Sequence, residues 1–91
     1  MDFQELSYHL EQYGCHLDIL IDEGHLATNC ISGHVCVIER LDHYTNPTLC
    51  HYCYELGIPA PASLAIEFER YRNLRDELAE TIKVPKNSDG S

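Results

Sequence analysis

The first part of the chain shows two hydrophobic periods, that of a helix followed by that of a strand. One apolar face with helical spacing is made of Phe3, Leu6, Leu10 and Tyr13. Asp2 and Glu5 match a helix-opening capping box in which Asp takes the place of Ser or Thr. Gly14 is well placed to end this helix. From Cys15 onward apolar and polar residues alternate, which is typical of a half-buried strand.

Two further strands are expected in the middle of the chain. Residues 25–31 and 34–39 have strand-like patterns, with β-formers concentrated in the second segment. The turn pairs Glu23-Gly24 and Ser32-Gly33 separate the three strands. These segments together predict a three-stranded antiparallel meander.

Helical signals return after residue 45. Asn46 and Pro47 are typical of a helix start and Gly57 of a helix end, so a short helix is expected between them. A long amphipathic helix is expected over residues 62–84, and Pro85 should end it. Its apolar stripe consists of Leu64, Phe68, Tyr71, Leu74, Leu78 and Ile82.

The element order α-β-β-β-α-α predicts an α+β fold with a three-stranded antiparallel sheet and a long C-terminal amphipathic helix. Residues 1–84 are expected to form one compact domain and residues 85–91 a flexible tail. Packing on the sheet is one way to cover the apolar stripe of the long helix. Because this helix spans about 34 Å, more than a small sheet needs, a homodimer through the six stripe residues is the alternative.

Length and composition limit the classes of protein that fit. A chain of 91 residues has room for one small domain, which excludes two-lobed nucleotide-binding folds and barrel enzymes. With 44% hydrophobic and 23% charged residues, the composition is that of a folded domain. The sequence contains no apolar run of membrane-spanning length and does not begin like a signal peptide, so we expect a cytoplasmic protein.

Charge is distributed unevenly along the chain. The net charge is −9, and the first 39 residues contain seven acidic residues but no Lys or Arg. This balance argues against direct binding to nucleic acid, whose phosphates attract basic residues, and favours a basic protein partner. Solubility alone is the simpler explanation. The expected partner-binding residues are Glu5, Glu11, Asp18, Leu20, Asp22 and Glu23, with Leu20 as an exposed apolar anchor.

Cysteine and histidine residues cluster between positions 30 and 53. Cys50 and Cys53 form a C-x-x-C pair near the expected start of the short helix, where the helix dipole favours the thiolate that binds metal. A closed zinc site needs four tetrahedral ligands, so two further residues must complete the pair. The expected zinc ligands are Cys36, His43, Cys50 and Cys53, with His34 or Cys30 as substitutes. Over residues 30–53 this plan resembles treble-clef zinc domains, although the first ligand pair is not a C-x-x-C followed by Gly.

The cysteines have two other interpretations. They can be small buried hydrophobes, which is how free cysteines usually behave. Cys50 and Cys53 can also be a redox dithiol, since the pair resembles the thioredoxin-type motif, but the chain has no βαβ unit before it. Five cysteines without a secretion signal do not indicate a disulfide framework.

No motif indicates catalysis. His34 and Cys36 followed by the C-x-x-C pair resemble the zinc deaminases, but the catalytic Glu after the His and the Pro directly before the pair are missing. Phosphate-binding glycine loops and nucleophile-elbow motifs do not occur either. We therefore expect a small acidic intracellular protein that is not an enzyme. Its expected role is to bind a macromolecule as an inhibitor that masks a basic nucleic-acid-binding surface, as phage-type inhibitors and nucleic-acid mimics do. The alternative is a zinc-binding or thiol-redox regulator with its site at Cys50 and Cys53.

Overall fold

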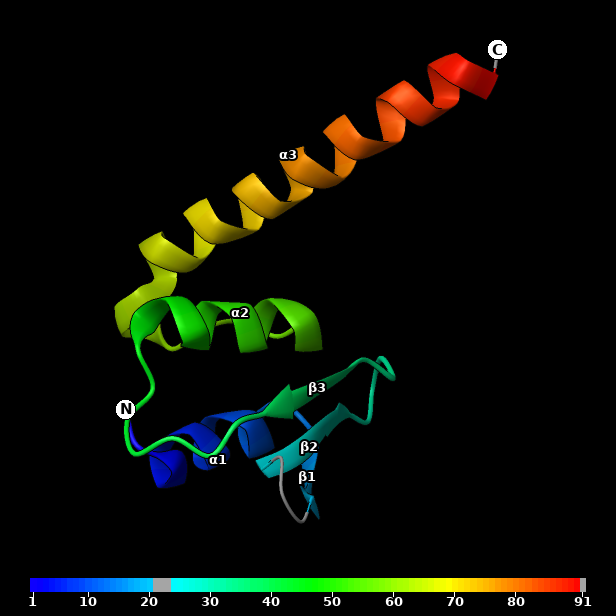
Figure 1. Cartoon of the computed structure of the whole chain (residues 1–91). Helices are drawn as coiled ribbons and strands as arrows, with labels where there is room; N and C mark the ends of the chain where they lie inside the picture. The colour runs from blue at the N-terminus through cyan, green and yellow to red at the C-terminus, as the bar shows by residue number, and fades with distance from the viewer. Residues whose placement is uncertain (21–23, 91) are drawn as a thin grey trace.

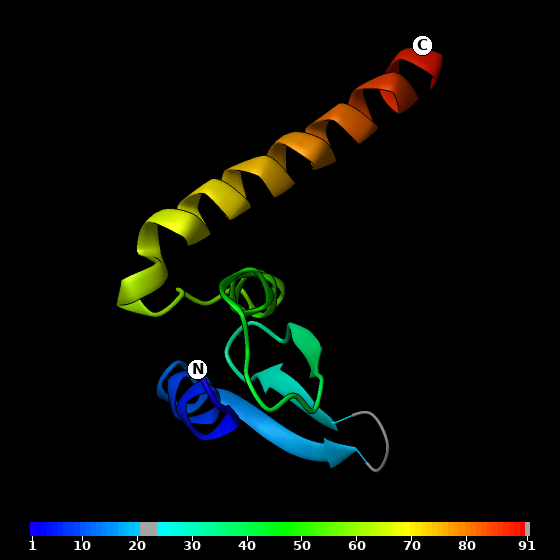
Figure 2. The same ribbon diagram turned by 60° about the vertical axis from the view of Figure 1, so that its left-hand side comes forward.

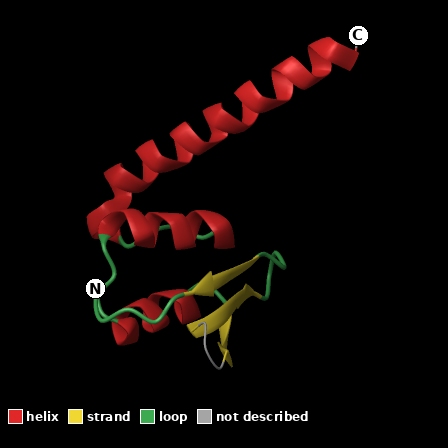
Figure 3. Cartoon of the chain, viewed as in Figure 1, coloured by secondary structure: helices red, strands yellow, loops and turns green. Residues whose placement is uncertain are grey.

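The structure is a computed structural model that describes the backbone of residues 1–20 and 24–90, and the side chains of 1–20 and 24–80. Within these residues the elements follow the order α1-β1-β2-β3-α2-η1-α3, where η1 is a single 3-10 turn. Figure 3 shows the strands grouped at one end of the molecule and the last helix extending from the other. This arrangement confirms the α+β fold and the long C-terminal helix.

Helix α1 (Phe3–Gln12) begins as the capping box predicts. The Asp2 carboxylate accepts a hydrogen bond from the Glu5 amide at 2.9 Å, and the Glu5 carboxylate accepts one from the Asp2 amide at 3.4 Å. Gly14 lies just after the helix with φ of 79°, a left-handed conformation that glycine adopts without strain. The sequence therefore predicted both ends of this helix correctly.

One side of α1 packs into the core. Leu6 and Leu10 are fully buried, and Phe3 packs against the core while remaining partly exposed. Tyr13 was expected on the same face, but it is the residue after the last helical turn and is 39% exposed. The helical period no longer applies there, so the buried face is shorter than predicted.

The sheet consists of β1 (Cys15–Leu20), β2 (Gly24–Asn29) and β3 (Val35–Ile38). The strands pair antiparallel in the order β1-β2-β3, which confirms the predicted meander. Strand β2 ends two residues earlier than predicted because a turn begins at Cys30, and β3 is one residue shorter than predicted at each end. The predicted turn residue Glu23 lies outside the described residues, while Gly24 is the first residue of β2.

Helix α2 (Asn46–Leu56) covers the buried face of the sheet together with α1, and Figure 1 shows it running alongside β3. Its N-cap is Thr45, so Asn46 is the first helical residue and does not cap the helix. Gly57 ends the helix with φ of 68°, as predicted. The core lies between the two helices and the sheet, and its largest fully buried side chains are Tyr44, Leu6, Leu10, Ile38, Leu49, Leu56, Cys50 and Cys53.

Helix α3 (Ala65–Gly90) follows the 3-10 turn η1 (Ala62–Leu64) and leaves the rest of the molecule. Only its first turns lie beside α2, and its C-terminal half points away from the body in both views (Figures 1 and 2). The backbone stays helical past Pro85, so the predicted helix end there is wrong. Proline is compatible with helical φ and loses one hydrogen bond, which a long helix can tolerate at a cost in stability. No described helix has the length and hydrophobicity needed to cross a membrane.

Candidate functional site

The register of the strands gives the sheet one covered and one open face. On the covered face Cys15, Ala27, Asn29, Cys36 and Ile38 are buried beneath α1 and α2, and Ile19 at the far end of β1 is exposed. No described helix lies over the opposite face. We call this second surface the open sheet face. It carries the side chains of His16, Asp18, Leu20, Leu26, Thr28, Val35 and Val37. Four of the seven are aliphatic, which is unusual for a sheet surface left in contact with water.

Two cross-strand rows organise the open sheet face. Asp18 pairs with Leu26, which pairs with Val37, so one row runs from an acid on β1 to an apolar side chain on β3. Directly opposite side chains lie about 5 Å apart in such rows. Val37 is 43% exposed and Val35, in the second row, is 54% exposed. The face therefore presents an apolar patch whose β1 edge carries Asp18, with its carboxylate 3.0 Å from Nε2 of His16.

The predicted partner-binding residues divide into three groups in the structure. Asp18 and Leu20 share the open sheet face, although Leu20 is only partly exposed and Ile19 beside it is 74% exposed. Leu20 is therefore a weaker anchor than expected. The Arg40 guanidinium donates a hydrogen bond to the backbone carbonyl of Leu20 at 3.2 Å. Asp22 and Glu23 lie outside the described residues.

Glu5 and Glu11, the remaining predicted acids, are exposed on α1. Because the buried side of α1 contacts the covered face of the sheet, these acids and Asp18 belong to different sides of the sheet. Tyr8 lies between the two glutamates along the helix and is 65% exposed. The structure thus divides the predicted acidic surface in two.

The four predicted zinc ligands are not arranged around one point, because Cys36 and Cys53 belong to the buried core whereas His43 is exposed. His43 is exposed, with its Nδ1 atom 3.3 Å from the N-terminal nitrogen, whereas Cys50 and Cys53 are 1% and 0% exposed. Both cysteines lie in the middle of α2 and not at its start, so the helix N-terminus does not favour their thiolates. Among the residues whose side chains are described, no group of three or more His, Cys, Asp or Glu is arranged to hold a metal ion. The zinc site stays a prediction from spacing.

Burial controls the chemistry of the core cysteines. It raises the pKa of the Cys53 thiol to about 12 and that of Cys36 to about 11, because a thiolate there would lose its water. Burial also raises the pKa of Cys15 and Cys50. Cys30 is the exposed cysteine. The four buried thiols accordingly behave as small hydrophobic side chains. Because their raised pKa values disfavour the reactive thiolate, they do not support a redox role.

Contacts between α2 and α3 include residues that the sequence analysis did not single out. The Tyr54 hydroxyl donates to the Asp76 carboxylate at 3.0 Å, which raises the pKa of Tyr54. The Arg75 guanidinium lies over the Tyr54 ring at 5.2 Å and donates to Glu55 at 3.4 Å. Tyr71 meets Tyr54 edge to face at 5.8 Å. These contacts fix the N-terminal half of α3 against α2.

The predicted apolar stripe of α3 is therefore only partly covered. Leu64 is buried and Phe68 and Tyr71 are partly buried, but Leu74 and Leu78 are 57% and 52% exposed. The Ile82 side chain lies outside the described part of the chain. A homodimer through this stripe remains a prediction, restricted by the structure to the uncovered leucines.

No protein-family model, curated protein or solved structure matches the chain. The functional argument therefore proceeds from the surfaces described above.

Proposed function

We propose that the protein binds a basic protein partner through its open sheet face, and that it acts by masking a surface with which the partner binds nucleic acid. The observation that carries the proposal is the row of Asp18, Leu26 and Val37 on the open sheet face, in which Asp18 and Val37 are exposed and Leu26 is partly exposed. It lies in the first 39 residues of the chain, which contain no Lys or Arg.

Apolar and acidic side chains have different tasks in this proposal. Leu26, Val35 and Val37 supply apolar area that is released from water on binding, which is the main source of affinity. The acidic charge steers a basic partner and disfavours acidic ones. A typical interface uses about 20–30 residues on each side, so the seven side chains of the open sheet face would form its centre.

The net charge of −9 suits an inhibitor of nucleic-acid binding. A surface built for phosphates is basic and attracts acidic proteins for the same electrostatic reason. The attraction between exposed charges is screened over about 8 Å at physiological ionic strength, so raising the salt concentration should slow association.

Two matched variants test the proposal. The sheet variant combines Asp18→Lys with Val37→Thr, and the control combines Glu11→Lys with Tyr8→Gln on α1. Both variants have the same change in net charge and lose one exposed apolar or aromatic side chain. Each is used to capture proteins from a nuclease-treated lysate, and the captured proteins are then assayed for binding to a fluorescent oligonucleotide.

We expect the original protein and the α1 control to retain nucleic-acid-binding proteins and to block their oligonucleotide binding. The sheet variant should lose at least tenfold in affinity for the same partners. Equal affinity of the two variants would show that the open sheet face is not the binding surface. If none of the three proteins retains a nucleic-acid-binding protein, the proposed inhibitory function is wrong.

A further inference from the structure

A hollow of about 540 Å³ lies between the end of α2, the linker that follows it and the first turns of α3. We call it the α2–α3 hollow. Its volume is in the range of small-molecule sites. The linker contributes Ile58 and Pro59, and α3 contributes Phe68, Glu69, Arg72 and Asp76. It is separate from the open sheet face, which has no residue in common with it.

Two charged side chains of the hollow, Glu69 and Arg72, have no hydrogen-bond or ion-pair partner among the described residues. Among the described residues, Arg72 makes no hydrogen bond or ion pair, and its guanidinium carbon lies 5.9 Å from the centroid of the Phe68 ring. Glu69 likewise makes no hydrogen bond or ion pair within the described part of the chain. Asp76 differs because its carboxylate already accepts a hydrogen bond from Tyr54. One cationic and one anionic group are thus open to a ligand.

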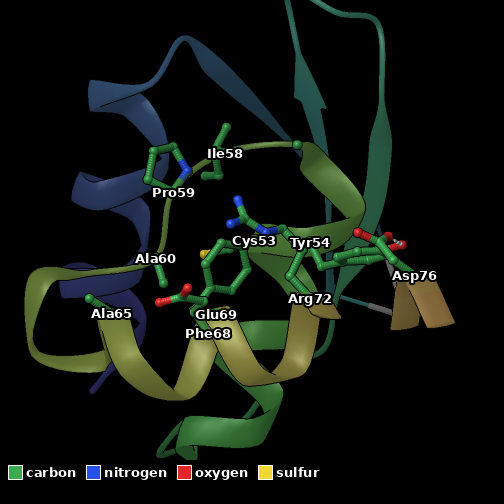
Figure 4. Close-up of a pocket in the computed structure, with 11 residues that line it drawn as sticks. Cys53, Tyr54, Ile58, Pro59, Ala60, Ala65, Phe68, Glu69, Arg72 and Asp76 are labelled. Carbon is green, nitrogen blue, oxygen red and sulfur yellow. Dashed lines mark hydrogen bonds between the residues drawn. The ribbon is translucent and has the colours of Figure 1, made fainter. Parts of the chain in front are cut away.

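The positions of these groups are close to one another on α3. Glu69 and Arg72 are three residues apart, which places their Cβ atoms about 5–6 Å apart on neighbouring turns. Figure 4 shows the Phe68 ring between them on the α3 side of the hollow, with Ile58 and Pro59 across from it. Ile58 is 5% exposed, so it anchors this opposite wall in the core, and Pro59 beside it is exposed.

This arrangement selects a ligand by its charges. A purely anionic ligand would approach Arg72 but would be repelled by Glu69 and Asp76, and a purely cationic ligand would be repelled by Arg72. A ligand with an ammonium and a carboxylate on the same carbon atom satisfies both groups. The guanidinium is suited to a carboxylate, to which it can donate two parallel hydrogen bonds, and the Glu69 carboxylate is suited to an ammonium.

We propose that the α2–α3 hollow binds a free apolar amino acid. Its carboxylate lies on Arg72, its ammonium lies on Glu69, and its side chain lies between Phe68 and the linker residues Ile58 and Pro59. A residue within a peptide lacks both charges, and a terminal residue lacks one of them. The site therefore favours the free amino acid over a peptide segment.

The probes for the test are L-phenylalanine and two analogues that each lack one charged group. 3-Phenylpropanoate lacks the ammonium, and phenethylamine lacks the carboxylate. Each is titrated into ¹⁵N-labelled full-length protein while the amide chemical shifts are followed. We expect shifts at the amides of Gly57, Ile58 and Ala60 and of residues 65–72, and at least tenfold tighter binding of phenylalanine than of either analogue.

Single substitutions assign each charge to its residue. Arg72→Gln should make phenylalanine bind no better than phenethylamine, and Glu69→Gln should make it bind no better than 3-phenylpropanoate. Arg70→Gln is the matched control, because Arg70 is an exposed residue of the same helix that does not line the hollow. All three positions are exposed, so the amide spectra of the variants should remain those of the folded protein.

Three results would overturn the proposal. Phenylalanine that binds no tighter than both analogues would remove the requirement for two charges. Shifts confined to residues outside the hollow would place the ligand elsewhere. Retention of full affinity and full discrimination by Arg72→Gln would show that the guanidinium does not hold the carboxylate.

Discussion

Substitution of Asn29 should destabilise the domain strongly, because its side chain connects the β2–β3 turn to the C-terminal end of α2. The side-chain nitrogen donates to the Leu56 carbonyl at 2.8 Å. The side-chain oxygen accepts from the amides of Ile31 at 3.0 Å and Ser32 at 3.3 Å. Asn29 is 4% exposed, so water cannot replace these partners without a rearrangement.

The magnitude follows from which groups lose their partners. A buried polar group left unsatisfied costs about 1–3 kcal/mol. In Asn29→Ala the Leu56 carbonyl carries most of this penalty, because the turn amides of Ile31 and Ser32 belong to exposed residues and can be hydrated. We expect a total loss of about 2–4 kcal/mol in the free energy of unfolding.

Asn29→Asp separates the two roles of the side chain. The carboxylate can still accept from the turn amides, but it cannot donate to Leu56 and places negative charge beside that carbonyl. The charged form is disfavoured in the folded state, so the pKa of the introduced carboxyl is raised on folding. The variant is therefore most stable, relative to the original protein, at acid pH, and it loses this stability as pH rises through the raised pKa.

Urea unfolding followed by circular dichroism at pH 5 and pH 7.5 measures these effects. Asn73→Asp is the matched control, because Asn73 is exposed on α3 and the same chemical change there should alter stability by less than about 0.5 kcal/mol. The reasoning is refuted if Asn29→Asp is as stable as the control at pH 7.5. It is also refuted if the deficit of Asn29→Asp is larger at pH 5.

Three other predictions concern single elements. Gly24→Ala should cost more than about 2 kcal/mol, seen as a lower melting temperature, because a Cβ atom there would overlap the Ile38 carbonyl oxygen and φ is 114°. In the unfolded chain the Cys53 thiol ionises above pH 9.0. In the folded protein burial raises the pKa of this thiol to about 12 and keeps it protonated. Stability should therefore fall by up to about 1.4 kcal/mol per pH unit for this thiol; Cys53→Val should reduce the slope of urea midpoint against pH. If the uncovered leucines pair two copies, light scattering should show a dimer at high micromolar concentration and a monomer for the double variant Leu74→Lys, Leu78→Lys; a monomeric original protein would contradict the homodimer.

Local signals in the sequence predicted the elements well because their causes are local. The capping pair of Asp2 and Glu5 and the glycines at positions 14 and 57 act through neighbouring backbone groups, and the structure shows each in its predicted role. The alternation of apolar and polar residues from Cys15 onward correctly predicted which side of the N-terminal part of β1 faces the core. It could not predict that Ile19, in phase with the buried residues, is 74% exposed. That outcome depends on how far the helices extend over the sheet.

Tertiary contacts decided what the sequence could not. The pattern of α3 gives one continuous stripe, but α2 covers only its N-terminal part. Tyr54 and Arg75 join the two helices through polar and ring contacts that no hydrophobic period indicates. Arg72 and Asp76 have the spacing of a helical ion pair. In the structure, however, Arg72 contacts the Phe68 ring and Asp76 accepts a hydrogen bond from the Tyr54 hydroxyl. The spacing along α3 therefore indicated which charged side chains lie close together. Contacts with the neighbouring helix α2 determined which interactions those side chains make.

The same tertiary arrangement makes the two proposed sites separable. Val37 on the open sheet face and Cys53 in the wall of the α2–α3 hollow are on opposite sides of the core, with the covered face of the sheet between them. The charges differ as well, because three of the four described arginines belong to α3 and none to the first 39 residues. Arg72→Gln should therefore leave capture of the basic partner unchanged, and Asp18→Lys with Val37→Thr should leave phenylalanine affinity unchanged. If either variant abolishes both activities while its amide spectrum remains that of the folded protein, the two surfaces are coupled and the assignment of one function to each is wrong.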